Sequence, residues 1–208
     1  MTIYDISMPV QAGTPVWEGD TPYRFNLTWQ MSKGSSVNVG AVAMSTHTGT
    51  HVDAPLHFLP NAGTIGSLPL PPFLGPAVVA DVRGKSVISI ADLADYDFQA
   101  TPRLLLRSDF WEDRSRFPEA IPTLAPEVPS WLSAQGVCLV GVDVPSVDPL
   151  DSKELPVHHA LAAGNIAILE SLDLRHISPG NYTLIALPLS LTEADASPVR
   201  AVLMEGSL

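Results

Sequence analysis

Short apolar segments, rather than long helical repeats, dominate the pattern of hydrophobic and polar residues along the chain. Several of them, including "VCLVGV" and "IAIL", are continuously apolar, which is typical of strands covered on both faces. The pattern predicts strands at residues 2–6, 37–45, 77–82, 103–107, 137–142, 166–169, 183–186 and 199–204. Their order in a sheet does not follow from the pattern.

Helical signals are fewer than strand signals. Ser89 and Asp92 have the Ser-x-x-acid spacing of a helix start and lead into "ADLADY". A second helix is predicted at 124–135, before Gly136, with its two prolines confined to the first turns. A third is predicted at 154–163, before "GN". Together these elements predict one mixed α/β domain over residues 1–208, with more strand than helix.

Composition narrows the class of protein. A hydrophobic content of 46% in 208 residues fits a single sizeable core and argues against disorder. The net charge of −11, with no cluster of Lys and Arg, argues against nucleic-acid binding. No apolar run approaches the roughly 18 residues of a membrane span, and no signal peptide is evident, so a cytoplasmic protein is expected. The single cysteine, Cys138, excludes an internal disulfide and is expected to pack in a strand.

Polar chemistry concentrates in "HTGTHVDAPLHF", residues 47–58, which holds three of the six histidines. A helix would place His47 and His51 on one face, but the intervening "TGT" and the following Pro55 disfavour a helix. A straight strand would separate the same two histidines by roughly 13 Å, too far for one ion. We therefore expect a strand ending near residue 45, then a loop bent at Gly49 around a cation.

Two interpretations of this cluster remain: a metal site, or a polar loop with ordinary hydrogen-bonded histidines. Its density, with Asp53 as an added oxygen ligand, favours metal. Further ligands could come from "HHALAAGNIAILE", which supplies His158 or His159 and Glu170. A glutamate directly after a buried strand is costly unless it is paired. It could also simply face water at the strand end.

Four stretches resemble one family: "HTGTHVDAPLHF", "GVDVPSVD", "HHALAAGNIAILESL" and "ASPVRAVL". They are similar to the cyclase-type metal-dependent hydrolases and, within these, to the bacterial kynurenine formamidases (arylformamidases). The resemblance covers essentially the whole chain. It implies a swivelling β/β/α fold with a barrel-like mixed sheet, found as a dimer or tetramer; a homodimer is expected.

The resemblance also implies roles for individual residues in a two-zinc site. Its first ion would be held by His47, His51 and Asp53 with Glu170 nearby, and its second by Asp53, His158 and Glu170. His158 rather than His159 has the family's spacing to Glu170. His57 matches the catalytic histidine and Trp17 a substrate-contacting aromatic, although a tryptophan in a Pro-rich loop is more often a packing residue.

The implied reaction is hydrolysis of N-formyl-L-kynurenine to L-kynurenine and formate, a step of tryptophan degradation. A metal-activated water would attack the formyl carbon while His57 serves as general acid and base. One alternative is a related amidohydrolase, such as one that opens the cyclic amide isatin. Another is a metal-binding protein without catalysis. Manganese or another divalent ion would also suit imidazole and carboxylate ligands.

Overall fold

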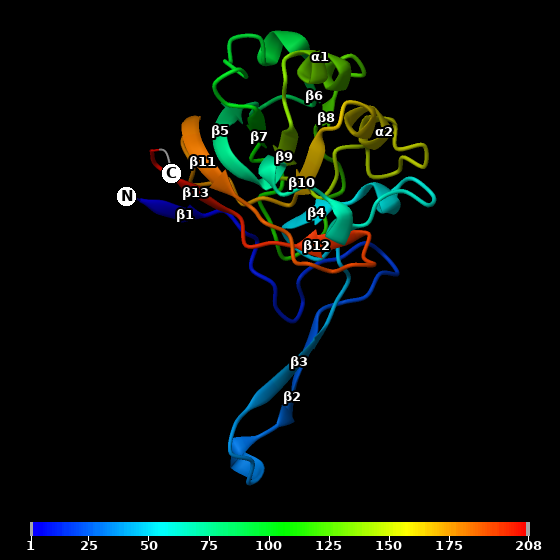
Figure 1. The fold of residues 1–208 in the computed structure, drawn as a ribbon, viewed down its shortest axis with the longest axis vertical. Helices are drawn as coiled ribbons and strands as arrows, with labels where there is room; N and C mark the ends of the chain where they lie inside the picture. Colours follow the sequence, from blue (N-terminus) through cyan, green and yellow to red (C-terminus); the bar gives the residue numbers. More distant parts are fainter. Residues whose placement is uncertain (1, 207–208) are drawn as a thin grey trace.

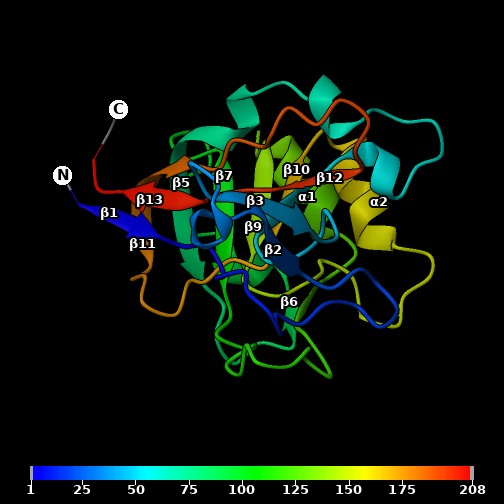
Figure 2. The same cartoon turned by 90° about the horizontal axis from the view of Figure 1, so that it is seen from below.

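The computed structural model of the chain describes residues 2–206. One large mixed sheet curls through the body, and two α-helices lie on one side of it (Figure 1). A two-stranded hairpin extends away from this body and is seen nearly end-on in Figure 2. The mixed α/β architecture expected from the sequence is thus confirmed.

The central sheet has nine strands with a parallel centre and antiparallel flanks. Across the sheet they are β1 (Ile3–Asp5), β13 (Val202–Met204), β11 (Gly180–Ile185), β5 (Leu74–Asp81), β7 (Arg103–Arg107), β9 (Leu139–Val142), β10 (Ala167–Glu170), β4 (His51–Asp53) and β12 (Ala196–Pro198). Strands β5, β7, β9 and β10 run parallel to one another, and the other pairs are antiparallel.

The remaining elements are short. They are the pair β2 (Arg24–Trp29) and β3 (Val39–Ala43), the pair β6 (Val87–Ile88) and β8 (Thr123–Leu124), the helices α1 (Val128–Ala134) and α2 (Pro156–Ala163), and the 3-10 turns η1 (Met31–Lys33), η2 (Pro55–His57), η3 (Ile65–Ser67), η4 (Pro71–Phe73) and η5 (Ile90–Asp92). Within residues 2–206, none of the helices has the length and apolar character that crossing a membrane requires.

The parallel strands are buried on both faces. In β7, Leu104 and Leu106 face one core, which Leu132 of α1 and Leu161 of α2 cover. Leu105 faces a second core on the opposite side of the sheet. The second core also contains residues of the outer strands β11 and β13 and of the 3-10 turns η3 and η4. This two-sided burial is the reason that these strands are continuously apolar in sequence.

All eight predicted strands coincide with strands of the structure, but the helices needed correction. The segment after Ser89 forms the expected capping box with Asp92, yet continues only as the 3-10 turn η5. The helix predicted at 124–135 is shorter, because β8 precedes it and α1 begins at Val128. Strands β2, β4, β6, β8 and β12 were not predicted.

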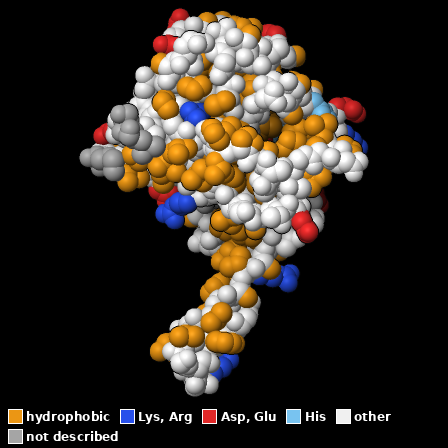
Figure 3. Space-filling model, in the orientation of Figure 1, with side chains coloured by type: hydrophobic (Ala, Val, Ile, Leu, Met, Phe, Trp, Pro, Cys, Tyr) orange, Lys and Arg blue, Asp and Glu red, His pale blue; other side chains and the backbone are white. Residues whose placement is uncertain are grey.

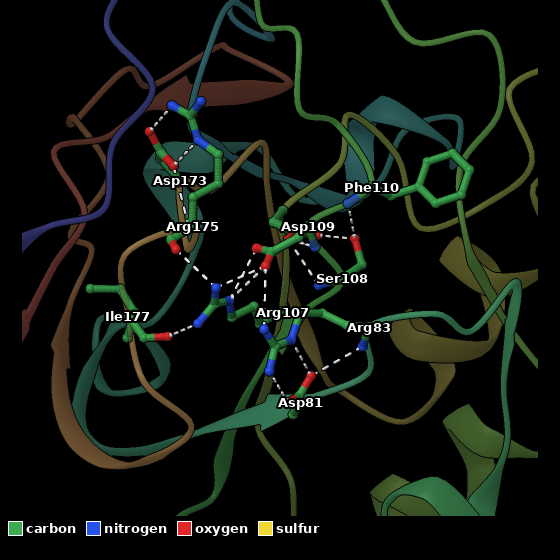
Figure 4. A network of polar contacts seen from close by, with 10 residues as sticks. Asp81, Arg83, Arg107, Ser108, Asp109, Phe110, Asp173, Arg175 and Ile177 are labelled. Atoms are coloured by element: carbon green, nitrogen blue, oxygen red, sulfur yellow. Dashed lines mark hydrogen bonds and ion pairs between the residues drawn. The ribbon is translucent and has the colours of Figure 1, made fainter.

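Arg107, at the end of β7, ties the connection between β10 and β11 to the sheet (Figure 4). Its guanidinium pairs with Asp109 and donates hydrogen bonds to the carbonyls of Arg175 at 2.9 Å and Ile177 at 2.6 Å. The connection that follows Glu170 is therefore fixed by the neighbouring parallel strands.

A sharp turn joins β3 to β4, and it bends where the sequence predicts. Gly49 has a φ of 68°, in the left-handed region that side chains other than glycine disfavour. A Cβ at this position would also lie 2.7 Å from Cγ2 of Val10. The turn ends directly in β4, so His51 and Asp53 belong to a strand and not to the irregular loop that the sequence suggested.

Substitution Gly49→Ala is expected to destabilise the protein by more than the roughly 1–2 kcal/mol of left-handed backbone strain, because the new methyl group also collides with Val10. Gly13→Ala is the matched control, since Gly13 has a φ of 88° but open space around its Cβ position. Urea unfolding at a fixed metal concentration measures both. Equal losses for the two variants would show that the contact with Val10 carries no weight.

Candidate metal centre

The pairing of β4 with β10 sets the chemistry of one sheet face. His51 lies opposite Glu170, and Asp53 lies opposite Ile168. Because side chains alternate along a strand, His51 and Asp53 share a face while Val52 points into the opposite core. His51, Asp53 and Glu170 are each at least 95% buried. The sheet therefore presents two carboxylates and an imidazole together in a nearly dry environment.

His158, from α2, and His47, from the turn before β4, complete this cluster. Nε2 of His158 lies 3.5 Å from Oδ2 of Asp53 and 3.6 Å from Oε1 of Glu170. Nε2 of His51 lies 3.3 Å from Oδ1 of Asp53 and 3.5 Å from Oε2 of Glu170. Nδ1 of His47 lies 3.1 Å from Oδ1 of Asp53. The structure thus brings together the five residues that the family resemblance implies as ligands.

These close approaches are not hydrogen bonds. Both carboxylate oxygens of Asp53 and Nε2 of His51 are fully buried and have no hydrogen-bond partner among residues 2–206. An unpartnered buried carboxylate is costly, and buried polar groups in proteins are nearly always paired. A cation held among these atoms would remove that cost.

The outer nitrogens of two imidazoles explain why their inner nitrogens are free to bind a cation. Nδ1 of His51 lies 2.8 Å from the Gly49 carbonyl, which can only accept, so this nitrogen carries the proton. Nδ1 of His158 likewise donates to Asp148 at 2.7 Å. In both rings the lone pair is left on Nε2, which faces Asp53 and Glu170. An outer partner that fixes the tautomer is typical of metal-binding histidines.

His47 lies between two carboxylates. Its Nε2 is 3.1 Å from Oδ2 of Asp195, whose other oxygen accepts a hydrogen bond from the Thr46 hydroxyl at 2.8 Å. A proton on Nε2 directed at Asp195 leaves Nδ1 for a cation shared with Asp53. Asp195 then holds His47 as Asp148 holds His158.

The electrostatics of the cluster reflect its excess of buried negative charge. Burial, and then the charge of Asp53, raises the pKa of Glu170 to about 7. Burial alone would lower the pKa of His158, but hydrogen bonding to Asp148 and the nearby charges of Glu170 and Asp53 outweigh it and raise the pKa to about 10. The cluster thus attracts positive charge, whether from protons or from a metal.

The ligand atoms fit a metal by type and separation. His47, His51 and Asp53 form one compact set, and Asp53, His57 and His158 form another. Asp53 belongs to both sets, as a bridging carboxylate would. A third set joins His47 and His57 to Asp195. Imidazole and carboxylate donors suit zinc and related divalent ions.

His57 and Trp17 lie where the cluster opens to solvent. They line a pocket whose floor includes His47, His158 and Glu170. The side chain of His57 is 33% exposed, and its ring centroid is 4.0 Å from that of His47. Burial lowers the pKa of His57, which favours the neutral imidazole. Trp17 both lines this pocket and packs on Phe117, with ring centroids 4.8 Å apart.

Sequence reasoning missed Asp148 and Asp195. Asp148 lies in "GVDVPSVD", where it also accepts hydrogen bonds from the backbone N–H groups of Val157 and His158 at the start of α2. Asp195 precedes β12, and no motif in the sequence indicated a role for it. Conversely, His159 is exposed, which agrees with choosing His158 as the ligand, and His176 is exposed as well.

Comparison with known proteins decides the family. A family model described as "Putative cyclase" matches residues 4–149. The chain belongs to this cyclase family. The resemblance noted from the histidine-rich stretch is therefore confirmed, and the match includes His47, His51, Asp53 and His57.

Relatives in this family extend the match over nearly the whole chain. The kynurenine formamidase of Geobacillus thermodenitrificans is 47% identical, over 96% of this chain and 95% of its own. That of Bacillus cereus is 46% identical over the same shares. A predicted metal-dependent hydrolase from Bacillus stearothermophilus superposes with a TM-score of 0.82 at 26% identity, covering 97% of both chains.

A more distant cyclase-fold structure shares the architecture alone. Isatin hydrolase A from Ralstonia solanacearum has a TM-score of 0.81 at 20% identity, covering 98% of this chain and 92% of its own. The fold therefore does not choose between a linear and a cyclic amide.

Substitution Asp148→Asn is expected to weaken divalent-metal affinity by about 10- to 100-fold, because Nδ1 of His158 loses its carboxylate partner. Asn keeps one oxygen to accept from the backbone at the start of α2. Asp151→Asn, three residues on at an exposed position, is the matched control. Competition with a chelator measures affinity for Zn²⁺, and thermal melting verifies the fold. Unchanged affinity in Asp148→Asn would contradict the orienting role.

Proposed function

We propose that this chain is a metal-dependent arylformamidase that hydrolyses N-formyl-L-kynurenine to L-kynurenine and formate, acting as a homodimer. The observation that carries the proposal is the placement of the carboxylate–imidazole cluster at the floor of an open pocket lined by Trp17. The names of the 46–47% identical relatives support the same substrate.

Two divalent ions, with zinc as the first candidate and manganese as another, would be held by the five clustered residues. These are His47, His51, Asp53, His158 and Glu170, with Asp53 serving both ions. When bound, such ions make hydroxide available near neutral pH and polarise a carbonyl oxygen. The structure supports this assignment through the unpartnered atoms of Asp53 and His51.

His57 is the proposed general acid and base. It comes from η2, next to the cluster yet partly exposed, and so can meet both the reacting amide and solvent. In the reaction, the bond between the formyl carbon and the aryl nitrogen breaks. His57 delivers a proton to the departing nitrogen, while the oxygen of water ends in formate. An imidazole titrates close enough to neutral pH for this transfer.

Two groups on the pocket wall suit the rest of the substrate. Trp17 offers an aromatic surface for the substrate's benzene ring. Asp20 lines the same pocket and adds a carboxylate to its wall. We assign Asp20 to the α-ammonium group of N-formyl-L-kynurenine. Isatin has no ammonium group, so this carboxylate favours the linear substrate over the cyclic alternative.

Substitution His57→Ala is expected to lower kcat by about 10²- to 10⁴-fold, the usual contribution of a general acid–base group, without loss of bound metal. His159→Ala removes an exposed histidine nearby and should leave kcat unchanged. Steady-state assays and metal analysis of the same preparations provide both measurements. Full activity in His57→Ala would remove its catalytic role, and an inactive wild-type protein that binds metal would favour the non-catalytic alternative.

Parallel assays on N-formyl-L-kynurenine and isatin test the substrate. The wild-type protein should show a much higher kcat/KM on the linear amide. Asp20→Asn should raise KM for N-formyl-L-kynurenine by roughly 10-fold, the loss of one charge-assisted contact, and leave any isatin turnover unchanged. Glu18→Gln, an exposed charge two residues away, is the control. Faster turnover of isatin by the wild-type protein would overturn the formamidase assignment.

A further inference from the structure

Trp17, the aromatic residue on the wall of the pocket, lies in a segment with few ties to the body. Exposed hydrophobic side chains are spread over the lower body and the hairpin (Figure 3), so exposure alone does not distinguish this residue. Its segment, residues 9–20, contains neither a helix nor a strand. Among residues 2–206, every hydrogen bond that this segment makes stays within residues 9–21. The orientation of the indole therefore depends on side-chain packing.

One aromatic side chain packs directly on this indole. The ring centroid of Phe117 lies 4.8 Å from that of Trp17, with an angle of 55° between the two rings. This separation is within the range of favourable aromatic pairs. Phe117 is half-buried and does not itself line the pocket, so it supports the indole from behind.

The loop that carries Phe117, residues 108–122, is anchored in the core by Trp111. Trp111 is 4% exposed, and its ring centroid lies 5.9 Å from that of Phe117. Its indole N–H is shared between the carbonyls of Asp113 at 3.1 Å and Arg116 at 2.9 Å. These bonds close the chain around Trp111, and Phe117 is the next residue. The support of Trp17 is therefore itself fixed.

Arg114 ties the same loop to the central sheet. Its guanidinium carbon lies 4.4 Å from the ring centroid of Trp111, a cation–π contact. Its Nη2 donates to the carbonyls of Asp143 at 2.8 Å and Leu172 at 2.9 Å, just beyond the ends of β9 and β10. A continuous series of contacts thus leads from these strand ends through Arg114, Trp111 and Phe117 to the wall of the pocket.

We propose that Phe117 is a positioning residue for the benzene ring of the substrate, because it holds the indole of Trp17 in the pocket wall. The inference rests on the proposed arylformamidase function and extends it by naming the residue that orients the stacking surface. An indole that is already fixed loses little conformational freedom when the substrate binds, so the contact with Phe117 increases affinity. Attack on the formyl carbon and proton transfer are carried by other residues and should keep their rate.

Phe117→Leu keeps an apolar side chain but removes the ring. It is expected to raise KM for N-formyl-L-kynurenine by roughly 3- to 10-fold, the contribution of one aromatic pair, with kcat unchanged. Phe117→Tyr keeps the ring and should retain the wild-type KM. Phe110→Leu is the matched control, since Phe110 belongs to the same loop and is 49% exposed. Steady-state assays give kcat and KM, and thermal melting verifies the fold of each variant.

A double-mutant cycle separates positioning from a general structural effect. In a Trp17→Leu background, Phe117→Leu should cause no further rise in KM, because its effect passes through the indole. The proposal would be overturned by an equal rise in both backgrounds, by a fall in kcat that accounts for the whole loss of activity, or by a wild-type KM in Phe117→Leu.

Fluorescence tests the contact without turnover. The emission that Trp17→Phe removes belongs to Trp17, so paired measurements with and without this substitution isolate its signal. In Phe117→Leu this signal should be quenched more readily by acrylamide, because the indole is no longer held. Unchanged quenching would overturn the positioning role, whereas an inactive wild-type protein would overturn the proposed function. The two failures are therefore distinguishable.

Discussion

The burial of the Asp53 and Glu170 carboxylates is the constraint on which the rest of this structure depends. Taking an ionised carboxylate out of water costs several kcal/mol even after relaxation, and two neighbouring ones repel each other. The groups that face them are the imidazoles of His47, His51 and His158. An imidazole can bind a metal in its neutral form or become a cation by protonation. The cluster can therefore bind a metal, whereas Lys or Arg in the same positions would neutralise the carboxylates as ion pairs.

The outer partners of these imidazoles come from unrelated parts of the chain. The Gly49 carbonyl lies in the turn before β4, Asp148 in the connection from β9 to α2, and Asp195 directly before β12. Each partner sets which ring nitrogen keeps its lone pair. The pairing of β4 with β10 places His51 opposite Glu170 and so brings the ligand atoms together. The connections that carry Gly49, Asp148 and Asp195 then orient the imidazole rings. A one-residue slip of β4 would turn His51 and Asp53 into the opposite core.

The sequence predicted the elements whose signal is local. Continuous apolar runs marked the parallel strands, and the density of "HTGTHVD" marked the cluster. Strand β4 was not predicted because three residues are too few to show a periodic pattern. The roles of Asp148 and Asp195 were not predicted because their contacts form only in the folded chain. The helix expected after Ser89 ends at Asp92 although its capping box is in place, so this local signal begins a turn without extending it into a helix. The alternation in "RFNLTW" was readable as a strand with one buried face, but all six residues of β2 are exposed.

The hairpin of β2 and β3 and the candidate metal centre are linked through the chain itself. At the root of the hairpin, the backbone N–H of Ser45 donates to the Thr21 carbonyl at 3.1 Å, and the next residue, Thr46, donates its hydroxyl to Asp195. His47 follows directly, and its Nε2 faces the other oxygen of Asp195. The turn that carries His47 and Gly49 is therefore held both through its backbone and through the His47 imidazole. A cation bound by His47 would stabilise this ordered turn further, as any ligand stabilises the conformation that it binds.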